Sequence, residues 1–150
     1  MPIMDLAPDF KEFVALLNKH EVRYLVVGGY AVAFHGHPRY TKDLDVWLDA
    51  TADNATRVLN ALDEFGFGEL QLAVDDFLVP GFVIQLGRPP NRIDMLTSLK
   101  GVDFSECYER RVACRAGEIE TDFLDLESLK RNKRAVGRLQ DQADLDELIE

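Results

Sequence analysis

Several kinds of residue are scarce in this sequence, and each shortage excludes a class of protein. The chain has only two cysteines, Cys107 and Cys114, with no CxxC pair, so we expect free thiols rather than a disulfide framework or a zinc site. No apolar run approaches the roughly 20 residues that a bilayer span needs. The N-terminus also lacks the basic start and apolar run of a secretory signal. We therefore expect a soluble, cytoplasmic protein.

Positive charge is also in short supply. The 150 residues include 17 Lys and Arg against 27 Asp and Glu, a formal net charge of -10, which opposes indiscriminate binding to a polyanion. The exception is a basic stretch over 130–138, which is either a solvated helix face or a local contact for an anionic partner. The length fits one globular domain, residues 1–150.

The hydrophobic pattern predicts an alternation of helices and strands. Apolar residues at helical spacing predict helices over 8–20, 30–34, 51–65 and 104–110, and two more within 126–149. Short apolar or alternating runs bounded by turn residues predict strands over 22–27, 43–49, 82–86 and 92–96, and a strand pair within 112–123. Residues 67–80 fit neither pattern.

One of these strands has an acidic face. Asp43 and Asp45 alternate with Leu44 and Val46, so both carboxylates project to the same side of the strand, with Cβ atoms about 7 Å apart. A hard cation such as magnesium prefers carboxylate oxygens and keeps positions for water and substrate phosphates. The alternative interpretation is an exposed acidic strand without a ligand.

Other residues strengthen the metal interpretation. Gly28 and Gly29 follow a strand and precede a helix, where bare backbone N–H groups can receive phosphate oxygens. Asp94 lies on a later strand between core-facing Ile93 and Met95, so it can join the acidic face. Arg39 and Thr41, in the preceding loop, are candidates for phosphate contacts or for hydrogen bonds to the aspartates.

Together these residues resemble the nucleotidyltransferase superfamily typified by DNA polymerase beta. Its signature is a strand, Gly-Gly or Gly-Ser, then Asp-x-Asp, with a third acid on a following strand. The stretch from Val26 to Val46 resembles the bacterial branch that contains the abortive-infection (AbiEii-like) toxin nucleotidyltransferases and minimal single-domain relatives. The resemblance implies an α/β (α+β) fold, with a small mixed, largely antiparallel sheet flanked by helices.

The C-terminal segment also looks like the closing motif of that branch. Lys133 and Arg138 stand where a lysine and an arginine of that motif approach the nucleotide phosphates. Two departures are visible: Tyr30 stands where many members have Ser or Thr, and the helical C-terminal region is shorter than in the toxins.

The resemblance implies a Mg²⁺-dependent transfer of a nucleoside monophosphate from a nucleoside triphosphate, such as ATP, to an acceptor hydroxyl. Asp43, Asp45 and Asp94 would hold two ions, with Mn²⁺ as an alternative metal. The acceptor is an RNA end such as that of tRNA, a partner protein or a small molecule. Two other hypotheses stay open: a non-catalytic antitoxin that binds a cognate toxin, and a phosphohydrolase that uses the same aspartates on water.

Overall fold

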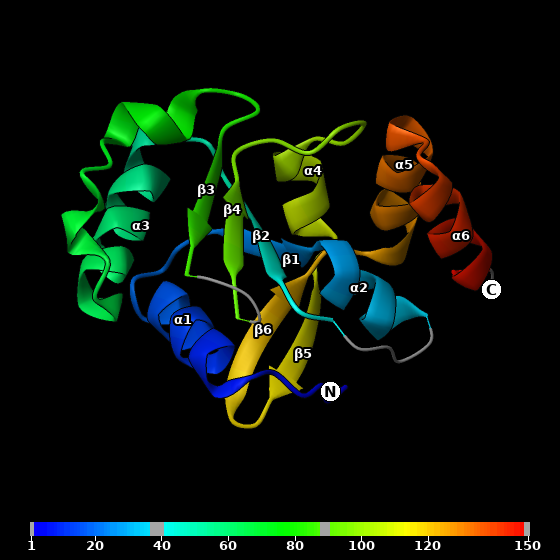
Figure 1. Cartoon of the computed structure of the whole chain (residues 1–150), viewed down its shortest axis with the longest axis horizontal. Helices are drawn as coiled ribbons and strands as arrows, with labels where there is room; N and C mark the ends of the chain where they lie inside the picture. Colours follow the sequence, from blue (N-terminus) through cyan, green and yellow to red (C-terminus); the bar gives the residue numbers. More distant parts are fainter. Residues whose placement is uncertain (1, 37–40, 88–90, 149–150) are drawn as a thin grey trace.

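The computed structural model describes residues 2–36, 41–87 and 91–148 (Figure 1). Its helices are α1 (Pro8–Lys19), α2 (Gly28–His35), α3 (Ala52–Phe65), α4 (Phe104–Glu109), α5 (Leu126–Val136) and α6 (Leu139–Glu147), with two short 3-10 helices, η1 (Gly68–Leu70) and η2 (Val74–Leu78). Its strands are β1 (Tyr24–Val27), β2 (Leu44–Leu48), β3 (Val83–Leu86), β4 (Ile93–Leu96), β5 (Val112–Ala116) and β6 (Ile119–Phe123). None of the described helices combines the length and the apolar character that crossing a bilayer would require.

The strands form one six-stranded sheet in the order β3-β4-β2-β1-β6-β5. The pairs β3–β4, β1–β2 and β5–β6 are antiparallel, whereas β2–β4 and β1–β6 are parallel. The predicted α/β fold with a mixed, largely antiparallel sheet is therefore confirmed. The parallel pairing of β2 with β4 matters most for the site, because it places the start of one strand beside the start of the other.

Helix α3 shows how local sequence sets an element. Thr51 precedes the helix, and its side chain accepts a hydrogen bond from the backbone N–H of Asn54, which satisfies one of the unpaired amides of the first turn. Buried residues recur along one face, among them Val58 and Leu62, and the helix ends at Gly66. The helix predicted over 51–65 is confirmed.

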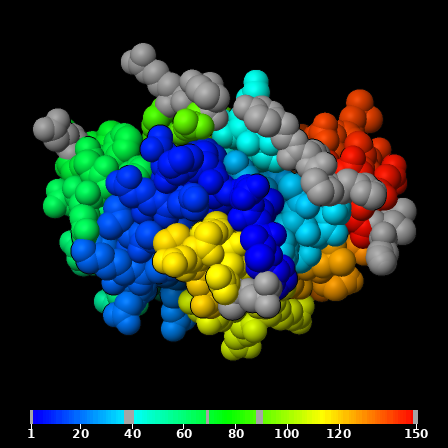
Figure 2. Space-filling view, turned by 90° about the horizontal axis from the view of Figure 1, so that it is seen from below, coloured from blue at the N-terminus to red at the C-terminus, as the bar shows by residue number. Residues whose placement is uncertain are grey.

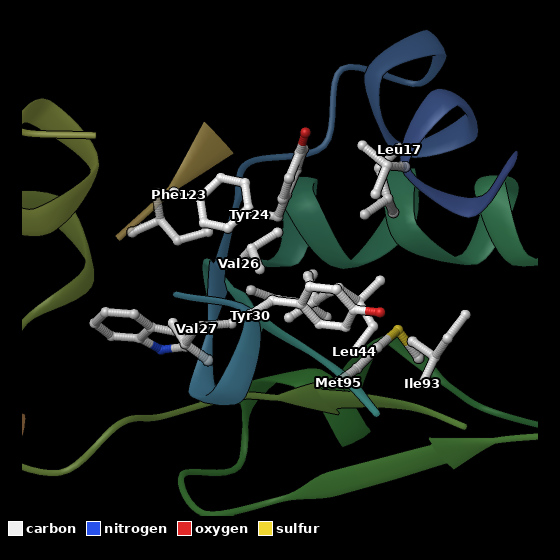
Figure 3. Packing of buried hydrophobic residues seen from close by; sticks show 14 of the residues in the cluster. Leu17, Tyr24, Val26, Val27, Tyr30, Leu44, Ile93, Met95 and Phe123 are labelled. Atoms are coloured by element: carbon white, nitrogen blue, oxygen red, sulfur yellow. The ribbon is translucent and has the colours of Figure 1, made fainter. Parts of the chain in front are cut away.

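The core lies where the sheet meets these helices. Figure 3 shows Leu44 of β2 next to Met95 of β4, and Val26 of β1 and Leu17 of α1 belong to the same buried cluster. The opposite face of the sheet is also covered in part, because the ring of Trp47 meets the ring of Phe104 on α4 edge to face at 5.1 Å between centroids. Trp47 is therefore a packing residue of the sheet.

The sequence pattern misses two details of the chain path. β1 begins at Tyr24 rather than at Val22, because Val22 still belongs to the turn that ends α1. In this turn the N–H of Val22 donates to the carbonyl of Leu17, and Glu21 has a left-handed φ of 57°. The stretch 67–80, which fits no period, contains the two 3-10 helices. Such helices are too short for a hydrophobic period to appear in the sequence.

The N-terminal segment covers one edge of the sheet. The N–H of Met4 donates to the carbonyl of Arg115, and the N–H of Arg115 donates to the carbonyl of Pro2. In Figure 2 this segment, in dark blue, lies against the yellow β5–β6 hairpin. Backbone groups at the edge of β5 are therefore paired, which blunts an edge that another chain could otherwise join.

The two cysteines are free, as the sequence predicts, and both are buried. Cys107 lies on α4 and Cys114 on β5, and they form no disulfide. Burial raises the pKa of both thiols above the ordinary value, so neither is an activated nucleophile.

Candidate active site

The three predicted aspartates meet at the start of two neighbouring strands. In the parallel pairing of β2 with β4, Asp45 lies directly opposite Asp94, and Asp43 comes two residues before Asp45. Side chains opposite one another on adjacent strands point to the same face. The structure therefore brings together three carboxylates that are up to 51 positions apart in the sequence.

The electrostatics of Asp45 show how crowded these carboxylates are. Burial, followed by repulsion from Asp94 and Asp43, raises the pKa of Asp45 to about 7, and a hydrogen bond with Asp94 favours the protonated form further. Arg92 partly offsets this shift. Without further positive charge, Asp45 therefore keeps a proton up to about neutral pH.

Arg92 is a member of this group that the sequence analysis missed as a functional residue. Its Nη2 atom donates hydrogen bonds to Oδ2 of Asp43 at 3.0 Å and to Oδ2 of Asp94 at 3.3 Å. Its Nε atom lies 3.2 Å from Oδ1 of Asp94. The available signal was the spacing: Arg92 precedes Asp94 by two residues, so in an extended strand it shares the face of Asp94.

Gly28 shapes the other side of the group. It begins α2 directly after β1, has a left-handed φ of 65°, and a Cβ atom at this position would collide with the carboxylate of Asp45. Only glycine meets both demands without strain. Asp45 therefore lies against bare backbone at the N-terminus of α2. Gly28 and Gly29 remain predicted phosphate contacts.

The loop before β2 is described only in part. Thr41 accepts a hydrogen bond at its backbone carbonyl from the hydroxyl of Tyr30, at 3.2 Å. Tyr30 thus holds Thr41 in place just before β2. Arg39, a predicted phosphate contact, lies outside the described residues. The predicted role of Thr41 stays a prediction.

Lys133 and Arg138 lie in a second cluster, between α5 and α6. The Nζ atom of buried Lys133 is 3.2 Å from Oδ1 of Asp141 and 2.9 Å from Oδ2 of Asp144. The Nε atom of Arg138 is 2.7 Å from Oδ2 of Asp141. Hydrogen bonds from Arg138 and Lys133 lower the pKa of Asp141 to about 2. Within the described part of the chain, neither cation contacts the strand aspartates, so their predicted nucleotide contacts stay predictions.

The strand carboxylates fit a hard divalent cation by chemistry and by charge. Carboxylate oxygens are the donors that magnesium prefers, and Oδ1 of Asp94 is buried without a hydrogen-bond partner among the described residues. Yet no group of three or more His, Cys, Asp or Glu side chains in the described ranges is already arranged around a metal position. One reason is visible in the contacts of Arg92, which lies against both oxygens of Asp94.

Part of the sequence matches a known protein family. Residues 9–78, just under half of the chain, match the family model of the aminoglycoside-2''-adenylyltransferases, a segment that contains Gly28, Gly29, Asp43 and Asp45. No curated protein matches the sequence. The narrower abortive-infection branch stays a prediction.

The structure was also compared with solved structures. A Thermotoga maritima protein described as a candidate nucleotidyltransferase superposes with a TM-score of 0.64 at 15% identity, over 96% of this chain and 94% of that one. An antigenic nucleotidyltransferase-like protein from Paracoccidioides brasiliensis has a TM-score of 0.49 at 17% identity, over 97% of this chain and 76% of its own. The first of these superpositions shows that the chain has a nucleotidyltransferase-like fold.

Proposed function

We propose that this chain transfers a nucleoside monophosphate from a nucleoside triphosphate to an acceptor hydroxyl, with magnesium or manganese held by Asp43, Asp45 and Asp94. The observation on which the proposal depends is that three carboxylates meet here, where burial and then their mutual repulsion raise the pKa of Asp45 to about 7. Such a perturbed pKa beside a glycine-lined helix N-terminus is typical of a functional site. A cytoplasmic location, where triphosphates are abundant, forms part of the proposal.

The residues of the site have distinct roles in this proposal. Asp43 and Asp45 would hold the cation, and Asp94 would contribute the third carboxylate. Cation binding requires Asp45 to lose its proton, so we expect the affinity for the cation to rise with pH near neutrality. When bound, the cation orients the triphosphate and lowers the pKa of the acceptor hydroxyl.

The phosphates are received by backbone and basic groups. In this proposal the N–H groups of Gly28 and Gly29 would receive the phosphate chain, and Arg39 and Thr41 are proposed as further contacts. The acceptor oxygen bonds to the α-phosphorus while the bond from that phosphorus to the bridging oxygen breaks, and pyrophosphate leaves. Release of pyrophosphate, rather than of inorganic phosphate, distinguishes this reaction from hydrolysis of the terminal phosphate.

The matched family supports ATP as the first donor to test, because its name describes adenylyl transfer. The acceptor is proposed only as a class: an aminoglycoside or other small molecule, an RNA end, or a partner protein.

The first experiment is calorimetric titration of ATP with Mg²⁺ into wild-type protein and Asp43→Ala/Asp45→Ala protein. A matched control is Asp53→Ala/Glu118→Ala, which removes the same charge from two exposed positions. We expect Mg²⁺-dependent binding in the wild type and the control and none in the site variant. Equal binding in all three proteins would refute the assignment of the site.

A second candidate function, a non-catalytic antitoxin that binds a cognate toxin, is favoured by one observation. The positive charge of Arg92 neutralises part of the negative charge of Asp43 and Asp94, as expected in a protein that no longer binds a metal there. This candidate predicts no magnesium-dependent nucleotide binding and a stoichiometric partner in native lysate. Release of pyrophosphate on addition of an acceptor would exclude it.

A further inference from the structure

Arg92 occupies the acidic group asymmetrically. It lies against both oxygens of Asp94 and one oxygen of Asp43. No hydrogen bond or ion pair joins it to Asp45 among the residues described. The guanidinium of Arg92 therefore covers Asp94. Asp45 and Oδ1 of Asp43 make no direct contact with it and are available to another ligand.

The contact between Arg92 and Asp94 is imperfect. The Nε atom of Arg92 and Oδ1 of Asp94 are 3.2 Å apart and oppositely charged, but both are buried and neither makes a hydrogen bond within the described chain. A buried donor and acceptor left unsatisfied weaken the arrangement that contains them. A better ligand for Oδ1 of Asp94 would therefore replace its contact with Nε without breaking a hydrogen bond at that oxygen.

The backbone at Arg92 is fixed, so displacement would involve the side chain alone. The carbonyl of Arg92 accepts a hydrogen bond of 3.0 Å from the N–H of Leu44 at the start of β2. The side chain is 31% exposed, which leaves it room to turn toward solvent. A long flexible stem on an anchored residue suits reversible pairing.

From these contacts we infer that Arg92 is an internal counter-ion that competes with a divalent cation for Asp94. The inference rests on the proposed metal site. The three carboxylates and the guanidinium together have a charge of about -2, which a single divalent ion at Asp43 and Asp45 would neutralise. A second ion at Asp94 would meet the positive charge of Arg92, so Arg92 must leave Asp94 first. The released guanidinium matches a phosphate oxygen pair of the incoming triphosphate.

The test uses Mn²⁺ alone, titrated by calorimetry into the full chain without nucleotide. The variant is Arg92→Gln, and the matched control is Arg111→Gln, which removes an arginine whose Nε is 3.6 Å from Oδ2 of Asp122 outside this group. Since the Arg92 pair is partly exposed, we expect Arg92→Gln to bind Mn²⁺ about three- to tenfold more tightly than wild type. Arg111→Gln should bind as wild type does.

A thermal measurement supplies a second readout. Arg92→Gln without metal should melt below wild type, because three carboxylates lose their counter-ion, and Mn²⁺ should raise its Tm by a larger increment than that of wild type. Equal or weaker Mn²⁺ binding by Arg92→Gln would overturn the inference. Weaker binding would identify Arg92 as a support of the metal site instead.

Two further results keep the inference testable and separate it from the proposed function. If Arg92→Gln does not fold, Arg92→Lys, a point charge that cannot span both oxygens of Asp94, should still bind Mn²⁺ more tightly than wild type; unchanged affinity would refute competition. If wild type binds Mn²⁺ and no variant differs, only the role of Arg92 fails. If no protein binds Mn²⁺ with or without ATP, the proposed function fails with it.

Discussion

Two clusters of charged side chains in this molecule use the same residue types with opposite results. The strand cluster (Asp43, Asp45, Arg92, Asp94) has three acids and one base, whereas the helix cluster (Lys133, Arg138, Asp141, Asp144) has two of each. The pKa of Asp45 is raised to about 7, and that of Asp141 is lowered to about 2. Burial and repulsion from like charges raise the pKa of Asp45, whereas hydrogen bonds from Arg138 and Lys133 lower that of Asp141. The charges of the helix cluster balance within the cluster, whereas the strand cluster has an excess of negative charge that a ligand can neutralise.

The largest expected effect is on the helix cluster. Lys133→Met leaves the buried carboxylates of Asp141 and Asp144 without their shared cation, and we expect a loss of about 3–5 kcal/mol in the free energy of unfolding. Urea unfolding measures it, with exposed Arg134→Met as the control. A loss below about 1 kcal/mol would show that Lys133 is not a structural cation and would favour its predicted contact with nucleotide.

Substitution in the strand cluster should have the opposite sign for stability. Asp45→Asn removes a carboxylate that is repelled by two others, so above neutral pH we expect stability to rise by about 1 kcal/mol. The same variant should lose at least about a hundredfold in Mg²⁺-dependent ATP affinity, because a metal ligand is gone. Calorimetry and urea unfolding on one preparation test both statements. A destabilised Asp45→Asn protein would make this aspartate structural.

The acid dependence of stability should reveal the helix cluster. The pKa of Asp141 in the folded protein lies below its ordinary value, so its contribution is fully present above about pH 4 and is lost as the pH falls toward 2. We expect the stability difference between wild type and Asp141→Asn to shrink over this window by on the order of 1–2 kcal/mol. A constant difference from pH 5 to pH 2 would contradict the lowered pKa.

The smallest expected effect comes from two glycines with the same backbone angle. Gly28 and Gly117 have φ values of 65° and 64°, but only at Gly28 would a Cβ collide with Asp45. Each substitution to alanine should cost about 1 kcal/mol from backbone strain. Gly28→Ala should additionally weaken Mg²⁺-dependent ATP binding by about tenfold. Equal nucleotide affinity in the two variants would separate Gly28 from the site.

The sequence predicts the strand cluster better than the helix cluster, for a physical reason. Alternation along a strand decides which side chains share a face, so the convergence of Asp43, Asp45 and Asp94 follows from spacing and is seen in the pairing of β2 with β4. Arg92 shares that face by the same rule, but a side-chain contact with Asp43, on a different strand, depends on register, which spacing alone does not give.

Lys133 illustrates the opposite case. Its position in a basic stretch suggests an exposed or ligand-binding cation, whereas its burial arises from the return of α6 against α5, which brings Asp141 and Asp144 onto it. A helical period locates each helix but not the angle at which two helices meet. The roles of Gly28, Gly29, Arg39, Thr41, Lys133 and Arg138 in nucleotide binding stay predictions.

The two buried thiols can report local unfolding of the protein, because a thiol reagent reaches them only when the structure around them opens. Cys107 on α4 and Cys114 on β5 are closed to solvent in the folded state, and neither belongs to a charged cluster. A thiol reagent can therefore react only when α4 or β5 opens, and the two labelling rates give the free energy of opening at each place separately. Because no cysteine has to be introduced, every variant described above can be followed in this way on its native background.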